Sequence, residues 1–262
     1  MIDAHIHLQD KRFDPDREKL LKQAEIDGVT VFFCAATCPA DWINVIELAK
    51  KHKNVYPFIG THPWYAGQHN FSLLKQLLND CPNAGVGEIG LDAVKGDPAQ
   101  ESVFREQLVI AAEMNRPCVV HCVKSFDQIA TCLKNLKKIP PVIMFHGFSG
   151  TLEQANFLSR FNAYFSFSGA VLFPERRKLQ KVIAALPAER LLVETDAPDM
   201  PPPFQTGTRN VPSNLPLIIK GIADIRKTDI ASLTAVLHQN AERFLLHRIY
   251  QSVPNADPPL IV

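Results

Sequence analysis

Two histidines, His5 and His7, stand one residue apart near the start of the chain. Side chains alternate in direction along an extended strand, so both imidazoles would project from one face, close enough to bind the same metal ion. Imidazole is a common ligand of zinc and related metals. Two histidines in a strand can also be ordinary polar residues, so the rest of the chain has to decide between these interpretations.

Four further polar residues lie where apolar runs meet loops: Glu88, His121, His146 and Asp196. Each has an ordinary explanation, since His121 could be a hydrogen-bonded core residue, His146 a helix cap and Asp196 a turn former. In a closed barrel of parallel strands, however, the carboxyl ends of all strands meet around one axis, where active sites form. Together with the first pair of histidines, these residues predict one shared metal centre.

Four imidazoles and two carboxylates can hold two divalent ions when one carboxylate bridges them. A water between two cations is acidified into a hydroxide nucleophile, so such a site needs no serine or cysteine nucleophile. We expect His5, His7 and Asp196 to bind one ion, His121 and His146 to bind the other, and Glu88 to bridge them. Zinc, manganese, cobalt or nickel suit an imidazole-rich site better than magnesium, although availability in the cell can decide the ion.

The elements that would position these residues alternate along the chain. Eight β-branched or apolar runs are separated by helical patterns, and this alternation predicts a parallel sheet wrapped by helices. We expect strands at residues 1–7, 29–35, 55–60, 84–88, 118–121, 142–146, 163–167 and 191–195. Helices are expected at about 213–226 and 229–248, followed by an irregular proline-rich tail at 252–262.

The fold class predicted from this pattern is α/β, a (β/α)8 TIM barrel of the metal-dependent hydrolase type, with residues 1–262 forming a single domain. A length of 262 residues suits such a barrel, which usually needs about 250. An open, doubly wound sheet is the alternative, but no Gly-rich dinucleotide fingerprint follows the first expected strand.

Composition narrows the function classes. The formal net charge is only +1, so any nucleic-acid contact should be confined to a cleft rather than rest on an overall basic field. No long apolar run or secretion signal is visible, so we expect a cytoplasmic protein without membrane contact. The six cysteines include no CxxC pair and are expected to be free thiols, and Cys34 and Cys38 lack the second pair that a structural zinc site would need.

Five short motifs carry a family resemblance. They are DAHIH at 3–7, GTHPW at 60–64, GEIGLD at 87–92, FHGFSG at 145–150 and ETDAP at 194–198. With these motifs, in this order, the chain resembles the TatD family of metal-dependent hydrolases, particularly its YjjV-like branch, within the amidohydrolase-like barrels. The resemblance implies a two-metal barrel and nuclease activity, often from a 3′ end of DNA with magnesium or manganese.

Carried over by position, the resemblance places the metal ligands on the six residues already singled out. It further implies that Asp196 accepts a proton from the attacking water and that His62 faces the substrate, although His62 could be a loop histidine fixed by Pro63. Asp3 and Glu194 would orient ligands or local backbone. The catalytic residues implied are Asp196, Glu88 and His62.

Two departures from the family pattern affect the substrate side. Cys122 and Val123 follow His121, where many relatives have Ser-Arg, and Val211-Pro212 follows Asn210, where many have Glu-Pro. Lys124 and Arg209 are therefore candidates for phosphate contact, whereas Arg176, Arg177 and Lys178 are expected at a solvated helix start. Trp64 and Tyr65 could stack on a base or simply wall the cleft.

The leading hypothesis is a metal-dependent hydrolase of ester bonds, a phosphodiesterase or deoxyribonuclease that trims single-stranded DNA or RNA from the 3′ end. The alternative keeps the site but changes the bond to a small phosphate or carboxylic ester, lactone or amide. A barrel that binds metal or nucleic acid without turnover is a third hypothesis, disfavoured because a full ligand set plus a base exceeds what binding requires. No obligate protein partner is expected.

Overall fold

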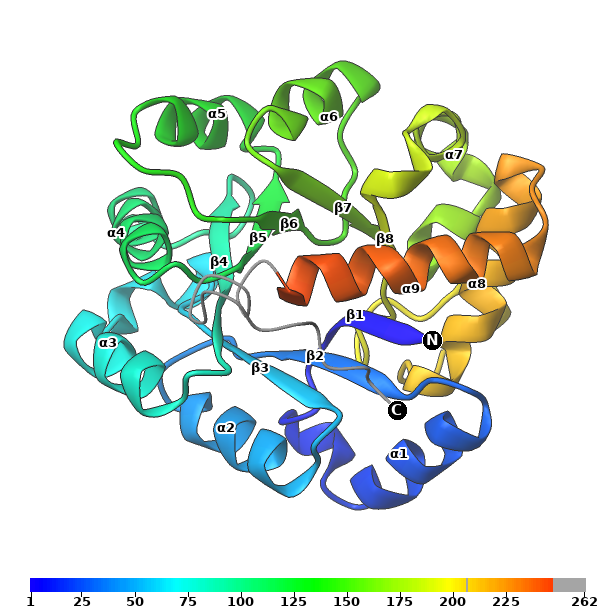
Figure 1. The fold of residues 1–262 in the computed structure, drawn as a ribbon, viewed down its shortest axis with the longest axis horizontal. Coiled ribbons are helices and arrows are strands. Elements are labelled where there is room, and N and C mark those ends of the chain that lie inside the picture. The colour runs from blue at the N-terminus through cyan, green and yellow to red at the C-terminus, as the bar shows by residue number, and fades with distance from the viewer. Residues whose placement is uncertain (206, 247–262) are drawn as a thin grey trace, which may run out of the picture.

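Eight parallel strands form a barrel surrounded by helices in this computed structural model, which describes residues 1–205 and 207–246. The strands pair in sequence order, β1 to β8, and Figure 1 shows them at the centre with the helices around them. The predicted (β/α)8 barrel is confirmed. The strands are β1 (Ile2–Ile6), β2 (Val31–Ala35), β3 (Val55–Ile59), β4 (Gly85–Asp92), β5 (Cys118–Val123), β6 (Ile143–Phe145), β7 (Ala163–Phe167) and β8 (Leu191–Val193).

One α-helix follows each strand, and a ninth helix ends the described part of the chain. They are α1 (Arg17–Ile26), α2 (Trp42–Lys51), α3 (Phe71–Asp80), α4 (Gln100–Glu113), α5 (Phe126–Lys134), α6 (Leu152–Ser159), α7 (Arg177–Ala185), α8 (Leu215–Arg226) and α9 (Ile230–Leu246). In the described residues, no helix is both long enough and apolar enough to cross a membrane.

The barrel is closed between β8 and β1 by the segment that follows β8. The amide of Asp196 donates to the carbonyl of His5 at 3.0 Å, and the amide of His7 donates to the carbonyl of Ala197 at 2.9 Å. The buried Asp3 carboxyl group adds two bonds, accepting from the Thr195 amide at 2.9 Å and from the Thr195 hydroxyl at 2.5 Å. Two motifs at opposite ends of the sequence are thereby held side by side.

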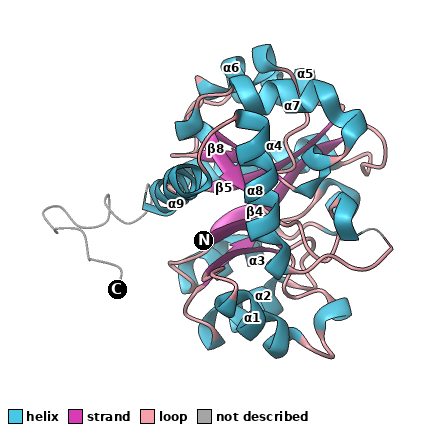
Figure 2. Cartoon of the chain, turned by 90° about the vertical axis from the view of Figure 1, so that its right-hand side faces the viewer, coloured by secondary structure: helices cyan, strands magenta, loops and turns pink. Residues whose placement is uncertain are grey.

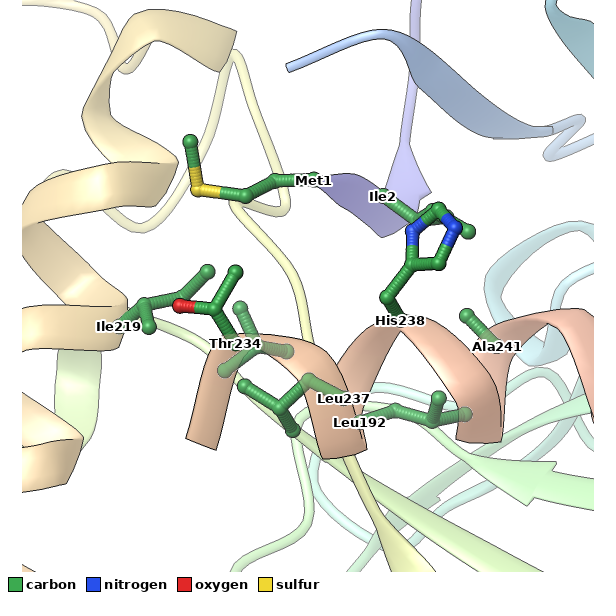
Figure 3. A pocket seen from close by; sticks show the side chains of 9 residues that line it. Met1, Ile2, Leu192, Ile219, Thr234, Leu237, His238 and Ala241 are labelled. Carbon is green, nitrogen blue, oxygen red and sulfur yellow. The ribbon is translucent and has the colours of Figure 1, made fainter. Parts of the chain in front are cut away.

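The amino end of the barrel is filled with apolar side chains. Phe33 of β2, Phe58 of β3 and Phe244 of α9 pack together with ring centroids 5.7–6.1 Å apart, and all three are buried. Burying a phenylalanine side chain stabilises a fold by about 1.5–3 kcal/mol. Helix α9 lies across this end, as Figures 1 and 2 show. In Figure 3 its His238 lies beside Ile2 of β1, and its Thr234 lies beside Ile219 of α8, around a small pocket. Chemistry is therefore left to the opposite, carboxyl end.

Several expected boundaries are wrong. Strand β4 does not end at Glu88 but continues to Asp92, and β5 continues past His121 to Val123. Strand β8 ends at Val193, so Asp196 lies in the following loop. Helix α8 begins at Leu215 after a short 3-10 turn, and the expected tail at 252–262 lies outside the described residues.

Candidate metal centre

The Glu88 carboxylate lies at the centre of the predicted ligand group. Its Oε1 is 2.6 Å from His146 Nε2 and 3.0 Å from His121 Nδ1. Its Oε2 is 3.3 Å from His5 Nε2 and 3.5 Å from His7 Nε2. Each oxygen of Glu88 therefore faces a different pair of histidines, as a carboxylate that bridges two ions requires.

Asp196 completes the group on the Oε2 side. Its Oδ1 lies 3.5 Å from His7 Nε2 and 3.7 Å from His5 Nε2. The side chain of Asp196 retains 15% exposure, whereas that of Glu88 retains 3%. The structure thus brings together all six residues predicted as metal ligands, and leaves Asp196 the carboxylate that water can reach.

Irregularities in two strands aim the side chains at this centre. In β1, Ile2 and Ala4 belong to the core at the amino end of the barrel, and the register against β2 then shifts between Asp3 and Ile6. In β4, the register against β5 shifts between Val86 and Ile89, which flank Glu88. Such irregularities commonly re-aim side chains beside active sites.

Buried contacts fix the orientation of the histidines. His7 Nδ1 lies 2.8 Å from the carbonyl of Ala35, to which it donates when protonated, so that Nε2 faces Asp196 and Glu88. His146 Nδ1 lies 3.7 Å from Glu194 Oε1, an oxygen that also accepts from the Gly147 amide at 2.7 Å. Groups of this kind set the orientation and basicity of metal-ligating histidines.

The centre carries opposing charges in close contact. Burial works against ionisation of Glu88, but the imidazoles of His146, His62 and His121 outweigh it and hold the Glu88 pKa well below its ordinary value. Burial likewise opposes a charge on His7, yet Asp196 and Glu88 raise its pKa to about 9. For His5, burial and the neighbouring His146 lower the pKa to about 4.

These residues fit divalent ions. Three groups of histidine and carboxylate atoms lie within 4.8 Å of one another, namely His5, His7 and Asp196; His5, Glu88 and His146; and His62, Glu88 and His121. His5 is fully buried, and neither of its ring nitrogens makes a hydrogen bond within the described chain. A buried imidazole facing two carboxylates without a hydrogen bond is explained by a metal ion between them.

The chain is similar to known metal-dependent hydrolases. A family model described as TatD related DNase matches residues 2–246. The chain belongs to the TatD-related DNase family. The resemblance predicted from the five motifs is thereby confirmed, and with it a metal-dependent hydrolase.

Individual relatives match this TatD-family chain over nearly its whole length. It is 31% identical over 247 residues to YjjV of Escherichia coli K12, named an uncharacterized metal-dependent hydrolase, covering 91% of this chain and 95% of that protein. The crystal structure of YjjV superposes with a TM-score of 0.88 and covers 93% and 97% of the two chains. The TatD protein of Pantoea ananatis, named a 3′-5′ ssDNA/RNA exonuclease, is 32% identical over 257 residues, covering 93% of this chain and 98% of that protein.

His62 lies closer to the metal centre of this TatD-family chain than its predicted substrate-facing role alone suggests. Its Nε2 is 3.3 Å from Glu88 Oε1, and its ring centroid is 4.4 Å from that of His121. However, His62 Nδ1 accepts from the Trp64 amide at 3.2 Å, and burial lowers the His62 pKa. A neutral His62 must then carry its proton on Nε2, which suits a donor rather than a metal ligand.

Asp92 is a site residue that the sequence reasoning did not assign. It ends β4 and is buried, with Oδ2 2.7 Å from Trp64 Nε1 and 3.3 Å from His121 Nε2. The signal was available, because Asp92 closes the motif that begins at Gly87. Placing the end of the strand at Glu88 concealed it.

The residues predicted to contact substrate lie in different surroundings. Trp64 is 41% exposed, and Lys95 Nζ lies 3.6 Å from its ring centre. Lys124 is exposed in the loop after β5. Arg209 instead forms an ion pair with Asp16 and donates to the carbonyl of Arg12. Phosphate binding by Arg209 stays a prediction. A phosphate could bind this side chain only after the ion pair with Asp16 is broken.

A pocket beside the metal centre is bordered by an arginine. Its volume is about 220 Å³, and it is lined by residues that include His146, Asp196, Phe148 and Met200. Arg176 is exposed at the start of α7, as expected, and also lines this pocket. Of the residues that follow His121, both Cys122 and Val123 line the same pocket. A guanidinium from the β7–α7 connection is therefore present where the β5–α5 loop offers no arginine.

The cysteines contribute no zinc site in the part of the chain that the structure describes. All six are free, and the candidate metal groups contain histidines and carboxylates only. Burial raises the pKa of Cys34 to about 12 and that of Cys122 to about 11. Both thiols therefore stay protonated at neutral pH, when they are poor ligands and nucleophiles.

Proposed function

We propose that this chain hydrolyses phosphodiester bonds at the 3′ end of single-stranded DNA or RNA, with two divalent ions held at the metal centre. The observation that carries the proposal is the Glu88 carboxylate, whose two oxygens face two separate groups of ligands. His5, His7 and Asp196 would hold one ion and His121 and His146 the other. When bound, the ions would acidify a water and neutralise negative charge on a phosphate.

Asp196 would act as the proton acceptor. Its carboxylate lies in the loop after β8, partly exposed, while its Oδ1 faces the imidazoles of His5 and His7. A carboxylate in this position can take the proton of an attacking water and release it to solvent. Glu88 lacks this access because its side chain is almost completely buried.

His62 would orient the substrate. With Nδ1 occupied by the Trp64 amide, its Nε2 proton points toward the centre, where Glu88 Oε1 lies 3.3 Å away. A phosphate oxygen at the centre could accept this proton in a hydrogen bond. His62→Ala should therefore impair catalysis or substrate binding while the metals remain bound, and loss of both metals would contradict this role.

The residues that line the neighbouring pocket support binding of a chain end. The pocket measures about 220 Å³, which is below the roughly 300–1,000 Å³ usual for drug-sized molecules. Phe148 and Met200 offer apolar surface to an organic group, and Arg176 offers a planar donor to a phosphate. The relatives named as 3′-5′ ssDNA/RNA exonucleases also support a nucleic-acid substrate.

The test uses metal-defined protein beside an Asp196→Asn variant, which controls for contaminating nuclease. End-labelled single-stranded DNA and RNA, small phosphate esters and small carboxylic esters are supplied separately. We expect stepwise shortening of a 5′-labelled oligonucleotide by the wild type, and none by the variant. Hydrolysis of small esters with every oligonucleotide intact would reject the nuclease assignment, and a lactone or amide substrate would then be sought.

Arg176 and Arg177 allow a matched test of the pocket, because they are adjacent exposed arginines and only Arg176 lines it. Arg176→Ala should raise KM for an oligonucleotide about tenfold, the loss of roughly one charged hydrogen bond, with little change in kcat. Arg177→Ala should behave as the wild type. Equal KM values for the two variants would exclude Arg176 from phosphate binding.

A further inference from the structure

The carboxylate of Asp92 is surrounded by hydrogen-bond donors. Its Oδ1 accepts from the amides of Val94 at 2.8 Å and Lys95 at 3.0 Å. Its Oδ2 lies 2.7 Å from Trp64 Nε1 and 3.3 Å from His121 Nε2. Three of these four neighbours can only donate, and an ionised carboxylate can only accept. Four acceptor positions on one buried side chain are therefore in use.

This arrangement decides where the proton of His121 lies. Both oxygens of Asp92 accept from groups that can only donate, Val94 and Lys95 on Oδ1 and Trp64 on Oδ2, so this side chain presents an acceptor to His121. His121 Nε2, which faces this carboxylate, must then carry the proton of the neutral imidazole. The lone pair is left on Nδ1, which lies 3.0 Å from Glu88 Oε1 and 3.3 Å from His146 Nε2. The nitrogen facing the centre is thus the one free to bind a metal.

The same carboxylate also holds a wall of the cleft. It anchors the indole of Trp64, and it binds the backbone of Lys95, whose ammonium lies over that indole. The ring of His62 lies between the two rings that Asp92 contacts, 4.8 Å from the Trp64 ring and 4.4 Å from the His121 ring. Asp92 therefore joins a candidate metal ligand to an exposed aromatic residue.

We propose that Asp92 is a positioning residue that fixes His121 as an Nδ1 ligand and holds Trp64 as a cleft wall. The inference rests on the proposed metal centre but not on the identity of the substrate. Asparagine at this position would present an NH2 group either to the two loop amides or to Trp64 and His121. With the amide oxygen kept on the loop, His121 could accept from that NH2 group only by moving its own proton to Nδ1, where a metal could no longer bind.

The first experiment compares Asp92→Asn with Asp97→Asn, since Asp97 also caps a backbone amide, that of Ala99 at 2.8 Å. Co²⁺ affinity and the visible spectrum of the cobalt-loaded protein are measured for each. Asp92→Asn should bind Co²⁺ about 10–100-fold more weakly, with a changed spectrum, as is typical when the partner of a ligating histidine is altered. Asp97→Asn should match the wild type. Wild-type affinity and spectrum in Asp92→Asn would overturn the proposal.

A third variant separates the contact of Asp92 with Trp64 from its contact with His121. Trp64→Phe removes the indole donor but leaves His121 and Asp92 unchanged, so cobalt affinity and spectrum should stay as in the wild type. Its activity should fall through KM rather than kcat. Loss of cobalt affinity in Trp64→Phe equal to that in Asp92→Asn would show that the loop, and not the contact with His121, supports the metal.

A direct measurement covers the case in which Asp92→Asn fails to fold. Nitrogen-15 labelling of histidine in the wild type, followed by long-range proton–nitrogen correlation, reports which ring nitrogen carries the proton. The His121 signal, assigned by its loss in His121→Gln, should show the Nε2–H form with and without Zn²⁺. An Nδ1–H form would overturn the proposal. The metal-free spectrum keeps this test separate from any failure of the proposed function.

Discussion

Glu88→Gln tests whether one carboxylate supports two metal sites. The Glu88 oxygens lie 2.6–3.3 Å from the imidazoles on one side and 3.3–3.5 Å from those on the other. Glutamine has nearly the same shape but carries no charge, and an amide is a far weaker ligand for these metals. We therefore expect both sites to lose affinity together in this variant.

The size of the effect can be set against a milder change. Altering a group that only orients a ligating histidine usually costs 10–100-fold in affinity, about 1.4–2.7 kcal/mol. Glu194→Gln is such a change, because Glu194 Oε1 lies 3.7 Å from His146 Nδ1 on one side of the centre. Glu88→Gln removes a direct ligand, so the loss should exceed about 100-fold at each of the two sites.

The assay is metal content after dialysis against Zn²⁺ at a concentration that just saturates the wild type. At this concentration we expect about two ions per wild-type chain and few in Glu88→Gln. At a higher zinc concentration, Glu194→Gln should bind nearly two ions, whereas Glu88→Gln should still bind few. Circular dichroism and urea unfolding of the metal-free proteins check that each variant is folded. One ion retained at full affinity in Glu88→Gln would refute the bridging role, and two would refute Glu88 as a ligand.

Further measurements test the surroundings of the centre. Asp3→Ala should lower the free energy of unfolding by about 2–5 kcal/mol, because two buried donors of Thr195 lose their acceptor. Burial raises the pKa of Asp3 to about 8, so the folded state binds this proton more tightly, and wild-type stability relative to Asp3→Asn should fall as the pH rises from about 4 to 8 in urea titrations. Despite burial, Asp196 and Glu88 raise the His7 pKa to about 9, so calorimetry at neutral pH should detect proton release on zinc binding, and apparent affinity should increase up to that pH. Gly90→Ala should destabilise by about 4 kcal/mol or more in urea unfolding, because the new Cβ would overlap the His121 carbonyl, whereas Gly207→Ala, at φ 88° with open space, should cost about 1–2 kcal/mol.

The barrel, and the meeting of the six candidate ligands at one end of it, could be predicted because the signals are local. Each strand is a short apolar run, and the polar residue that follows or interrupts it is visible in the sequence. The parallel arrangement then brings residues as distant as His5 and Asp196 to one end without any knowledge of their contacts. The six predicted ligands meet around Glu88 for this reason.

The strand boundaries could not be predicted in the same way. Glu88 interrupts the apolar run and was taken as its end, but Ile89 and Leu91 are apolar and buried, and the ladder with β5 continues to Asp92. The register shifts in β1 and β4 also depend on the neighbouring strands. A carboxylate four residues beyond Glu88 was therefore assigned no role, although it lies beside His121.

The cations of the substrate side depend on contacts between distant loops. Arg209 meets Asp16, 193 residues away, and Arg176, which lies at a solvated helix start as expected, also lines the pocket. Long side chains on loops can reach several partners, and local sequence does not choose among them. The surroundings of the candidate substrate residues were for this reason harder to predict than those of the candidate ligands.

The charges at the centre explain how so many ionisable groups can be buried together before any ion binds. Glu88 is held ionised, and the pKa of His146 is raised well above its ordinary value, against the effect of burial, by Glu88 and Glu194. The pKa of His7 is raised to about 9, against the effect of burial, by the carboxylates that it faces. Protons on these two imidazoles therefore balance the carboxylates, at nitrogens that would otherwise bind metal. Exchange of protons for ions leaves the buried charge compensated in both states, so the barrel can fold first and load its metals afterwards.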